Sequence, residues 1–148
     1  MIGLISDTHG LLRPEAVRAL KGSDLIIHAG DVGKPEILEQ LRTLAPVVAV
    51  RGNVDQGNWA EALPLTAVVD PGIYVLHDVK ELGLDPALSG FRMVVSGHSH
   101  KPSKTERAGV LYVNPGAAGP RRFRLPVTIA KLNVAKWDVE FVDLTGGK

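Results

Sequence analysis

The sequence predicts an α/β (α+β) fold in which two stacked β-sheets are flanked by helices, with parallel strands early and mixed or antiparallel strands later. In the first half, a short apolar run, a polar loop and a helix follow one another repeatedly, which is the βαβαβ pattern of a parallel sheet. In the second half, apolar runs lie close together with turns between them, which favours antiparallel pairing. The 148 residues suffice for one good core, so we expect one domain over residues 1–148.

Three apolar runs of the first half predict buried parallel strands, at residues 2–6, 24–28 and 46–50. Helices are predicted to begin at Pro14 and Pro35, because proline suits the first helical turn. Right-handed crossovers place the loop after each strand at the carboxyl edge of the sheet, where ligands bind in such folds.

The second half predicts further strands, at residues 66–69, 73–76, 91–95, 110–113, 127–132 and 137–142. Pro71 and Gly72 turn the first two of these into a hairpin, and residues 133–136 turn the last two. A short helical piece is expected near residues 80–88, and the tail at residues 146–148 is expected to fray.

Composition narrows the function classes. Hydrophobic residues make up 45% of the chain and charged residues 22%, which fits a soluble globular protein. The formal net charge of +1 gives no reason to expect a nucleic-acid or membrane partner. The chain has no cysteine, so any metal must bind oxygen and imidazole ligands. Neither a signal peptide nor an apolar run of the length of a membrane span is found, and a cytoplasmic protein is therefore expected.

Polar side chains follow the predicted strands at the points where those strands end. They are Asp7, His9, Asp31, Asn53, His77, His98 and His100. Four of the five histidines of the chain belong to this set. Neutral imidazole and carboxylate groups are the usual ligands of Mn, Fe and Zn, and one carboxylate can bridge two ions. The pattern indicates a two-metal hydrolytic centre in which seven ligands give four per metal if one carboxylate is shared.

Single residues of this set also have simpler interpretations. An aspartate after a strand is often a loop or capping carboxylate, and an asparagine beside a glycine is often a turn residue. His28 faces opposite to its neighbours in its strand, and we interpret it as a core residue or a residue that supports a ligand. The cluster of Arg121, Arg122 and Arg124 is either a solvated surface or a phosphate clamp, since guanidinium groups match phosphate oxygens. The metal hypothesis therefore rests on the joint pattern.

Five motifs occur in a fixed order along the chain: Asp7-x-His9, Gly30-Asp31, Gly52-Asn53, His77 and Gly97-His98-x-His100. In this order they resemble the motifs of the calcineurin-like metallophosphoesterases, and most closely those of the small bacterial and archaeal phosphodiesterase subfamily. The resemblance extends from residue 1 to about residue 124 and includes Asn114-Pro115-Gly116. It implies a four-layer αββα sandwich of two mixed sheets, with a di-metal site at the carboxyl edge of the strands.

The resemblance implies a role for each of the seven polar residues. The first metal would be held by Asp7, His9 and His100, and the second by Asn53, His77 and His98, with Asp31 bridging the two. Catalysis would involve Asp31, Asn53 and His98, through a metal-bound hydroxide and a contact with the phosphate. Asn53, Arg121 and Arg122 are candidates for binding the substrate. The cofactor would be two divalent ions, for which Mn²⁺ is the first expectation and Fe, Zn or Ni are alternatives.

The sequence departs from the family pattern in two places. Many members carry a histidine after the Gly-Asn of the third motif, where it assists the leaving group, and this chain has Val54 there. The small subfamily also lacks that histidine. Asp55 follows, and we expect it to orient a loop. His77 is followed by Asp78, where members often have glycine, and Asp78 is expected either to bond a ligand imidazole or to be solvated.

The function expected is metal-dependent hydrolysis of small phosphate esters, by a phosphodiesterase or phosphatase. A non-catalytic scaffold on the same fold is the alternative from another class, and the discriminating feature is completeness of the ligand set, which is filled at all seven positions. A nuclease would keep the chemistry, but the near-neutral charge argues against a nucleic-acid partner. No membrane partner is expected, and a homo-oligomer is left open.

Overall fold

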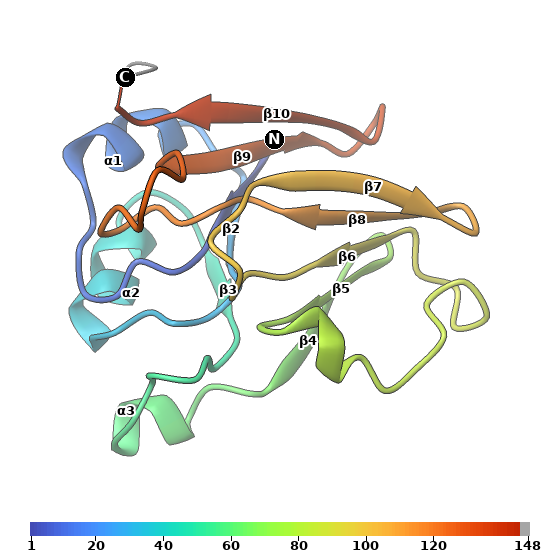
Figure 1. Cartoon of the computed structure of the whole chain (residues 1–148), viewed down its shortest axis with the longest axis horizontal. Helices are drawn as coiled ribbons and strands as arrows, with labels where there is room; N and C mark the ends of the chain where they lie inside the picture. Colours follow the sequence, from blue (N-terminus) through green and yellow to red (C-terminus); the bar gives the residue numbers. More distant parts are fainter. Residues whose placement is uncertain (146–148) are drawn as a thin grey trace.

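The computed structural model describes residues 1–145 and confirms the predicted pair of stacked mixed sheets (Figure 1). The first sheet has the strand order β10 (Asp138–Asp143), β9 (Thr128–Asn133), β1 (Ile2–Ile5), β2 (Leu25–His28) and β3 (Val47–Ala49). The second has the order β4 (Thr66–Val69), β5 (Ile73–Leu76), β6 (Met93–Val95), β8 (Val110–Asn114) and β7 (Ser103–Arg107). That residues 1–148 form one domain stays a prediction.

Each sheet contains three neighbouring parallel strands, and their direction sets the position of the loops. In the first sheet, β1 pairs in parallel with β2 and β2 with β3, while β9 and β10 add antiparallel strands. In the second, β5, β6 and β8 are parallel, and β4 and β7 are antiparallel edges. The loops that leave the parallel strands therefore share the carboxyl edge of each sheet.

The main core lies between the two sheets, because every apolar strand contributes alternate side chains to this interface. It includes Leu4 and Ile27 from the first sheet and Ile73, Met93 and Val113 from the second, each at most 2% exposed. These residues are branched aliphatics and one methionine, of the kind that pack well between sheets. The carboxyl edges of both sheets are thereby held together.

Two helices, α1 (Pro14–Leu20) and α2 (Pro35–Arg42), cover the outer face of the first sheet through a second apolar cluster. Both begin at proline, and neither is capped by a side chain at its N-terminus. The carboxylates that follow β1 and β2 are thus not helix caps.

The outer face of the second sheet has only a thin cover. The 3₁₀ helix η1 (Val79–Glu81) and the chain after it pack on a small cluster that includes Val94 and Tyr112. The four layers of the expected sandwich are present, but the fourth is reduced to this short turn and its loop. Figure 1 shows the long, open connection between η1 and β6.

Three details differ from the sequence expectations. The helical piece expected near residues 80–88 ends at Glu81, where Gly83 and Pro86 interrupt helical geometry. Strand β7 was missed because all five of its residues are polar and exposed, so it has no apolar alternation. The four-residue helix α3 (Asn58–Glu61) was also missed. The tail expected to fray lies outside the described residues, and no described helix is long and apolar enough to cross a membrane.

Truncating Leu20 should measurably destabilise the protein. Leu20 ends α1 and is completely buried against the first sheet, so Leu20→Ala should lower the free energy of unfolding by about 2–5 kcal/mol. Leu88→Ala is the matched control, since Leu88 is 87% exposed, and it should change stability by less than about 0.5 kcal/mol. Urea unfolding followed by circular dichroism measures both, and equal effects would contradict the assigned core.

Candidate metal centre

The seven polar residues that follow the strands come from five loops at one edge of the molecule. Asp7 and His9 follow β1, Asp31 follows β2, and Asn53 follows β3. The second sheet contributes His77 after β5 and the pair His98 and His100 after β6. Residues 90 or more positions apart in the sequence are in contact here, since the His98 N–H donates a hydrogen bond to Asp7 Oδ2 at 3.1 Å.

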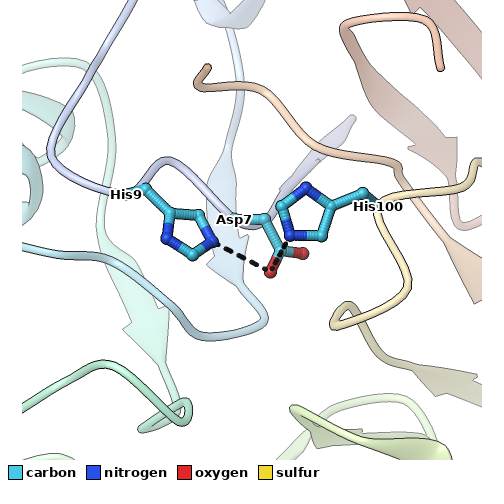
Figure 2. A group of neighbouring side chains, drawn as sticks. All are labelled: Asp7, His9 and His100. Atoms are coloured by element: carbon cyan, nitrogen blue, oxygen red, sulfur yellow. Dashed lines mark ion pairs between the residues drawn. The ribbon is translucent and has the colours of Figure 1, made fainter. Parts of the chain in front are cut away.

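Six of the seven residues form two groups whose nitrogen and oxygen atoms lie within 4.8 Å of one another. The groups are Asp7, His9 and His100, and Asp31, His77 and His98. Figure 2 shows the carboxylate of Asp7 between the rings of His9 and His100. Asp7 Oδ1 lies 3.7 Å from His9 Nε2 and 3.6 Å from His100 Nε2. Each group also contains one pair of adjacent imidazole rings, with centroids 5.2 Å apart.

The carboxylate of Asp31 connects the two groups. Its Oδ2 lies 3.2 Å from His77 Nε2 and 3.5 Å from His9 Nε2. Asp7 Oδ1 also reaches toward the other group, at 4.0 Å from His77 Nε2. The two groups therefore form one continuous centre.

Each carboxylate is oriented by hydrogen bonds to one of its two oxygens. Asp7 Oδ2 accepts from the Ser6 hydroxyl at 2.7 Å, in addition to the His98 N–H. Asp31 Oδ1 accepts from the Val54 N–H at 3.0 Å. The second oxygen of each residue is left to face the imidazoles.

Several buried polar atoms at this centre have no hydrogen-bond partner within the described chain. They are Asp7 Oδ1, His9 Nε2, His77 Nε2 and His100 Nδ1. The His77 Nδ1–H donates to the Ala29 carbonyl at 2.7 Å, which in a neutral ring leaves a lone pair on Nε2, 3.2 Å from Asp31 Oδ2. Leaving buried donors and acceptors unpaired is costly. Imidazole nitrogens and carboxylate oxygens that converge without partners are the donor set of a divalent cation, so these residues fit a metal.

The backbone at this centre is held in an unfavourable conformation. Eight non-glycine residues of the described chain have positive φ, and five of them are in the predicted ligand set: Asp7, His9, Asp31, His98 and His100, at 46–72°. Such conformations persist where surrounding structure enforces them, and they concentrate at functional sites. The chain is closely packed here, because a Cβ on Gly97 would collide with Ser6 Oγ and lie 2.6 Å from Asp7 Oδ2.

Electrostatics in the centre follow from burial and mutual proximity. Burial alone would raise the pKa of Asp31, but the His77 imidazole, the Val54 N–H and His9 together hold it well below its usual range. Burial opposes charge on His77 as well, yet Asp31 and the Ala29 carbonyl raise its pKa. Asp31 is therefore a carboxylate at any ordinary pH.

The pKa of His100 is shifted in the opposite direction from that of His77. Burial lowers the pKa of His100, and the positive charge of Arg122 lowers it further, against the attraction of Asp7. A depressed pKa keeps the imidazole neutral, which is the form that binds metals.

His28, which we expected in the core or behind a ligand, connects two of the loops. It is completely buried. The Gly30 N–H donates to its Nδ1 at 3.1 Å, so the neutral ring carries its hydrogen on Nε2, 3.0 Å from Thr8 Oγ1. The Thr8 hydroxyl in turn donates to the Val32 carbonyl at 2.9 Å. This chain of hydrogen bonds joins the loops of Asp7 and Asp31.

Asp55 joins the loops after β2 and β3. Its buried carboxylate accepts hydrogen bonds from the N–H groups of Gly52, Gly33 and Val32, at 2.8, 2.9 and 3.3 Å. These are the bonds expected of a residue that orients a loop.

Asn114 stabilises the turn that carries His98 and His100, and the sequence alone did not show this. Its side-chain amide donates to the Gly97 carbonyl at 2.9 Å and to Ser99 Oγ at 3.0 Å. Asn114 could be noticed in the sequence only as part of its Asn-Pro-Gly loop.

The remaining candidate site residues, Asn53 and the three arginines, are exposed. Asn53 is exposed and lines a cavity of about 340 Å³ together with His77 and Arg51. Arg121, Arg122 and Arg124 are exposed, and Arg121 donates to the Leu125 carbonyl at 3.2 Å.

Asp78 does not make the hydrogen bond to a ligand imidazole that was one of its two expected roles. Its Oδ2 stands 3.8 Å from His98 Nε2, beyond hydrogen-bond length. Its Oδ1 accepts from the Lys80 N–H at the start of η1.

Known proteins with similar sequences are described as metallophosphoesterases, which is consistent with a metal centre at this site. Residues 1–136 match the sequence pattern of the calcineurin-like phosphoesterase superfamily domain, and the chain belongs to this family. A "Probable metallophosphoesterase" of Methanothermobacter thermautotrophicus is 34% identical, covering 96% of this chain and 91% of that protein. A second "Probable metallophosphoesterase", from Methanocaldococcus jannaschii, is 38% identical, covering 90% and 76%.

Solved structures share the fold. An archaeal phosphodiesterase superposes with a TM-score of 0.73 at 22% identity, covering 96% of this chain and 98% of its own. Wild-type Vps29 from Entamoeba histolytica, complexed with Zn²⁺, has a TM-score of 0.70 at 22% identity, covering 97% and 98%. At such identities the likeness establishes the fold alone.

The buried His28 should make the metal-free protein less stable in acid. Burial lowers its pKa from 6.5 to about 4, against smaller opposing effects of Asp7 and Asp55. Between these values the unfolded chain binds the proton and the folded chain does not, so stability falls as pH falls. Its contribution should shrink by about 2 kcal/mol between about pH 7 and pH 5.

The measurement is urea unfolding of wild type and His28→Gln over this pH range, both with a chelator present. The variant should be less stable throughout but should lose less stability on acidification. Parallel pH curves for the two proteins would show that His28 does not titrate in this way.

Proposed function

We propose that this chain hydrolyses phosphate esters, phosphodiesters above all, with two divalent metal ions bound by the seven residues predicted from the sequence. The first ion would bind Asp7, His9 and His100, and the second would bind Asn53, His77 and His98. Asp31 would bridge them. Membership in the calcineurin-like phosphoesterase family supports the class of reaction.

The observation that carries this proposal is the position of Asp31 between the two groups. One oxygen is occupied by the Val54 N–H, and the other lies 3.2 and 3.5 Å from nitrogens that belong to different groups. A carboxylate shared in this way is what a pair of ions about 3.5–4 Å apart requires.

Two ions bound here would offset charge on the phosphoryl oxygens and would lower the pKa of a water molecule so that it can attack phosphorus. The protein's own contribution is to orient the ligands and to receive the substrate. The Asn53 amide, exposed at the rim, would donate a hydrogen bond to a phosphoryl oxygen as well as offering its carbonyl to the metal. Arg122 would add positive charge beside His100, and Arg121 is the second candidate contact.

The metal we propose first is Mn²⁺, with Fe, Zn and Ni as alternatives. Imidazole and carboxylate ligands without cysteine suit all four, so supply in the cell decides among them as much as affinity. The related fold of Vps29 has been solved with Zn²⁺.

The nature of the leaving group should matter strongly. Val54 stands where a proton-donating histidine would be, and it is 45% exposed at the site. No side chain at this position can protonate a departing alkoxide, so esters of acidic alcohols such as p-nitrophenol should react best.

A scaffold function is the second candidate, and Vps29 among the similar folds is the observation that favours it. A scaffold needs no complete set of ligands. The presence of all seven candidate ligands, the converging atoms of six of them and the strained backbone at five of them favour hydrolysis.

The decisive test is hydrolysis of bis(p-nitrophenyl) phosphate by protein loaded with Mn²⁺. Wild type should be active and should lose activity when a chelator removes the metal. Asp31→Asn should lower kcat by about 100-fold or more, because the shared negative charge is lost. Asp138→Asn, at an exposed position on β10, should match wild type.

Metal content, measured by mass spectrometry, accompanies the kinetics. Wild type should retain two ions per chain and Asp31→Asn fewer. A fully loaded wild-type protein that hydrolyses no phosphate ester would refute the proposal and favour the scaffold.

A further inference from the structure

A second cavity adjoins the candidate centre on the outer face of the second sheet. Its volume is about 390 Å³, within the range of small-molecule sites. Its walls come from β7, β8, η1 and the turn of residues 96–99. It contacts the centre through His98, whose side chain is 44% exposed. Asp78 lines both this cavity and the one beside His77.

The strand β7 gives this cavity a polar wall. Side chains alternate between the faces of a strand, so Ser103, Thr105 and Arg107 point to one face, and all three line the cavity. Opposite them on β8, Asn114 pairs with Ser103 and Tyr112 with Thr105, and both of these residues line it too.

The available groups are mostly hydrogen-bond donors. Ser99 Oγ accepts bonds from the Asn114 amide at 3.0 Å and the Lys101 N–H at 3.2 Å, so its own O–H is free to donate. Ser103, Thr105 and Arg107 are all exposed residues. Asp78 supplies an acceptor at the boundary with His98.

We propose that this cavity binds a polyol substituent of a phosphodiester substrate. This substituent, called the arm below, is the alcohol group that stays bonded to phosphorus when the leaving group departs. The inference rests on the proposed hydrolysis. Hydroxyl oxygens of a sugar or sugar alcohol would accept from the serine, threonine and arginine donors, and a hydroxyl hydrogen would bond Asp78. A phosphate at the metals would lead the arm past His98 into the cavity.

Other arms fit this surface less well. An aliphatic substituent would remove water from Ser99, Ser103, Thr105 and Arg107 without replacing the hydrogen bonds of that water. A nucleobase would have no open aromatic face to stack on at Tyr112, since the Arg107 guanidinium lies over that ring, 4.6 Å from its centroid. The chemistry therefore selects a polyol.

The test compares two diesters of p-nitrophenol whose second arms have similar size, glucose linked through its 6-oxygen and cyclohexylmethanol. In each, the oxygen of water bonds to phosphorus, the bond from phosphorus to p-nitrophenolate breaks, and the arm remains on the product monoester. One water proton stays on that product and the other is released. The quantity measured is the ratio of kcat/KM for glucose over cyclohexylmethyl.

Wild type should favour the glucose diester by about 10-fold, since each hydrogen bond contributes a factor of a few. Thr105→Val with Arg107→Ala should bring the ratio close to one. Lys104→Ala is the matched control, because it removes one positive charge from the opposite face of the same strand, and it should keep the wild-type ratio. A wild-type ratio of one, or the same ratio in all three proteins, would overturn the proposal.

Binding supplies a readout independent of turnover. Glucose 6-phosphate, titrated into protein loaded with diamagnetic Zn²⁺, should shift the backbone amide resonances of residues 103–107, and cyclohexylmethyl phosphate should do so only weakly. Hydrolysis of both diesters without preference would disprove the polyol site and leave the phosphoesterase proposal standing. Absence of all hydrolysis would refute the phosphoesterase proposal, and the titration would still decide whether the cavity binds the polyol.

Discussion

The rest of the centre depends on the different roles of the two oxygens in each of its aspartate carboxylates. Asp7 and Asp31 each use one oxygen to accept hydrogen bonds from the chain and turn the other toward the imidazoles. One of the two bonds to Asp7 comes from the N–H of His98, in the loop that follows β6 of the other sheet. This contact joins the carboxyl edges of the two sheets, so the same interaction that connects the sheets also orients a candidate ligand.

Sequence reasoning found most of this centre because its residues obey a topological rule. Parallel strands place the loops that follow them at a shared edge, so Asp7, Asp31 and His98 could be grouped without any knowledge of distances. The same reasoning predicted the two stacked sheets, since each apolar strand carries a clear pattern. Assignment of the ligands to particular ions remains a prediction.

What the sequence did not show depends on contacts between loops. The sequence predicted that Asp55 orients a loop, but no spacing of residues shows that its carboxylate accepts hydrogen bonds from three backbone N–H groups on two loops. His28 could be placed in the core from its strand position, but its tautomer follows from the Gly30 N–H. Strand β7 could not be predicted from the sequence because its residues are held by pairing with β8 and are not buried.

The outer faces of the two sheets are covered to different extents, and this separates the aspartates of the centre from the part of the surface that can vary. The first sheet is packed beneath two helices and carries Asp7, Asp31 and their supporting bonds. The outer face of the second sheet lies beneath only η1 and an open connection (Figure 1). Insertions or replacements in that connection would reshape the walls beside His98 without disturbing the aspartates. A lineage could therefore acquire new substrates by remodelling one surface while inheriting the reaction chemistry intact.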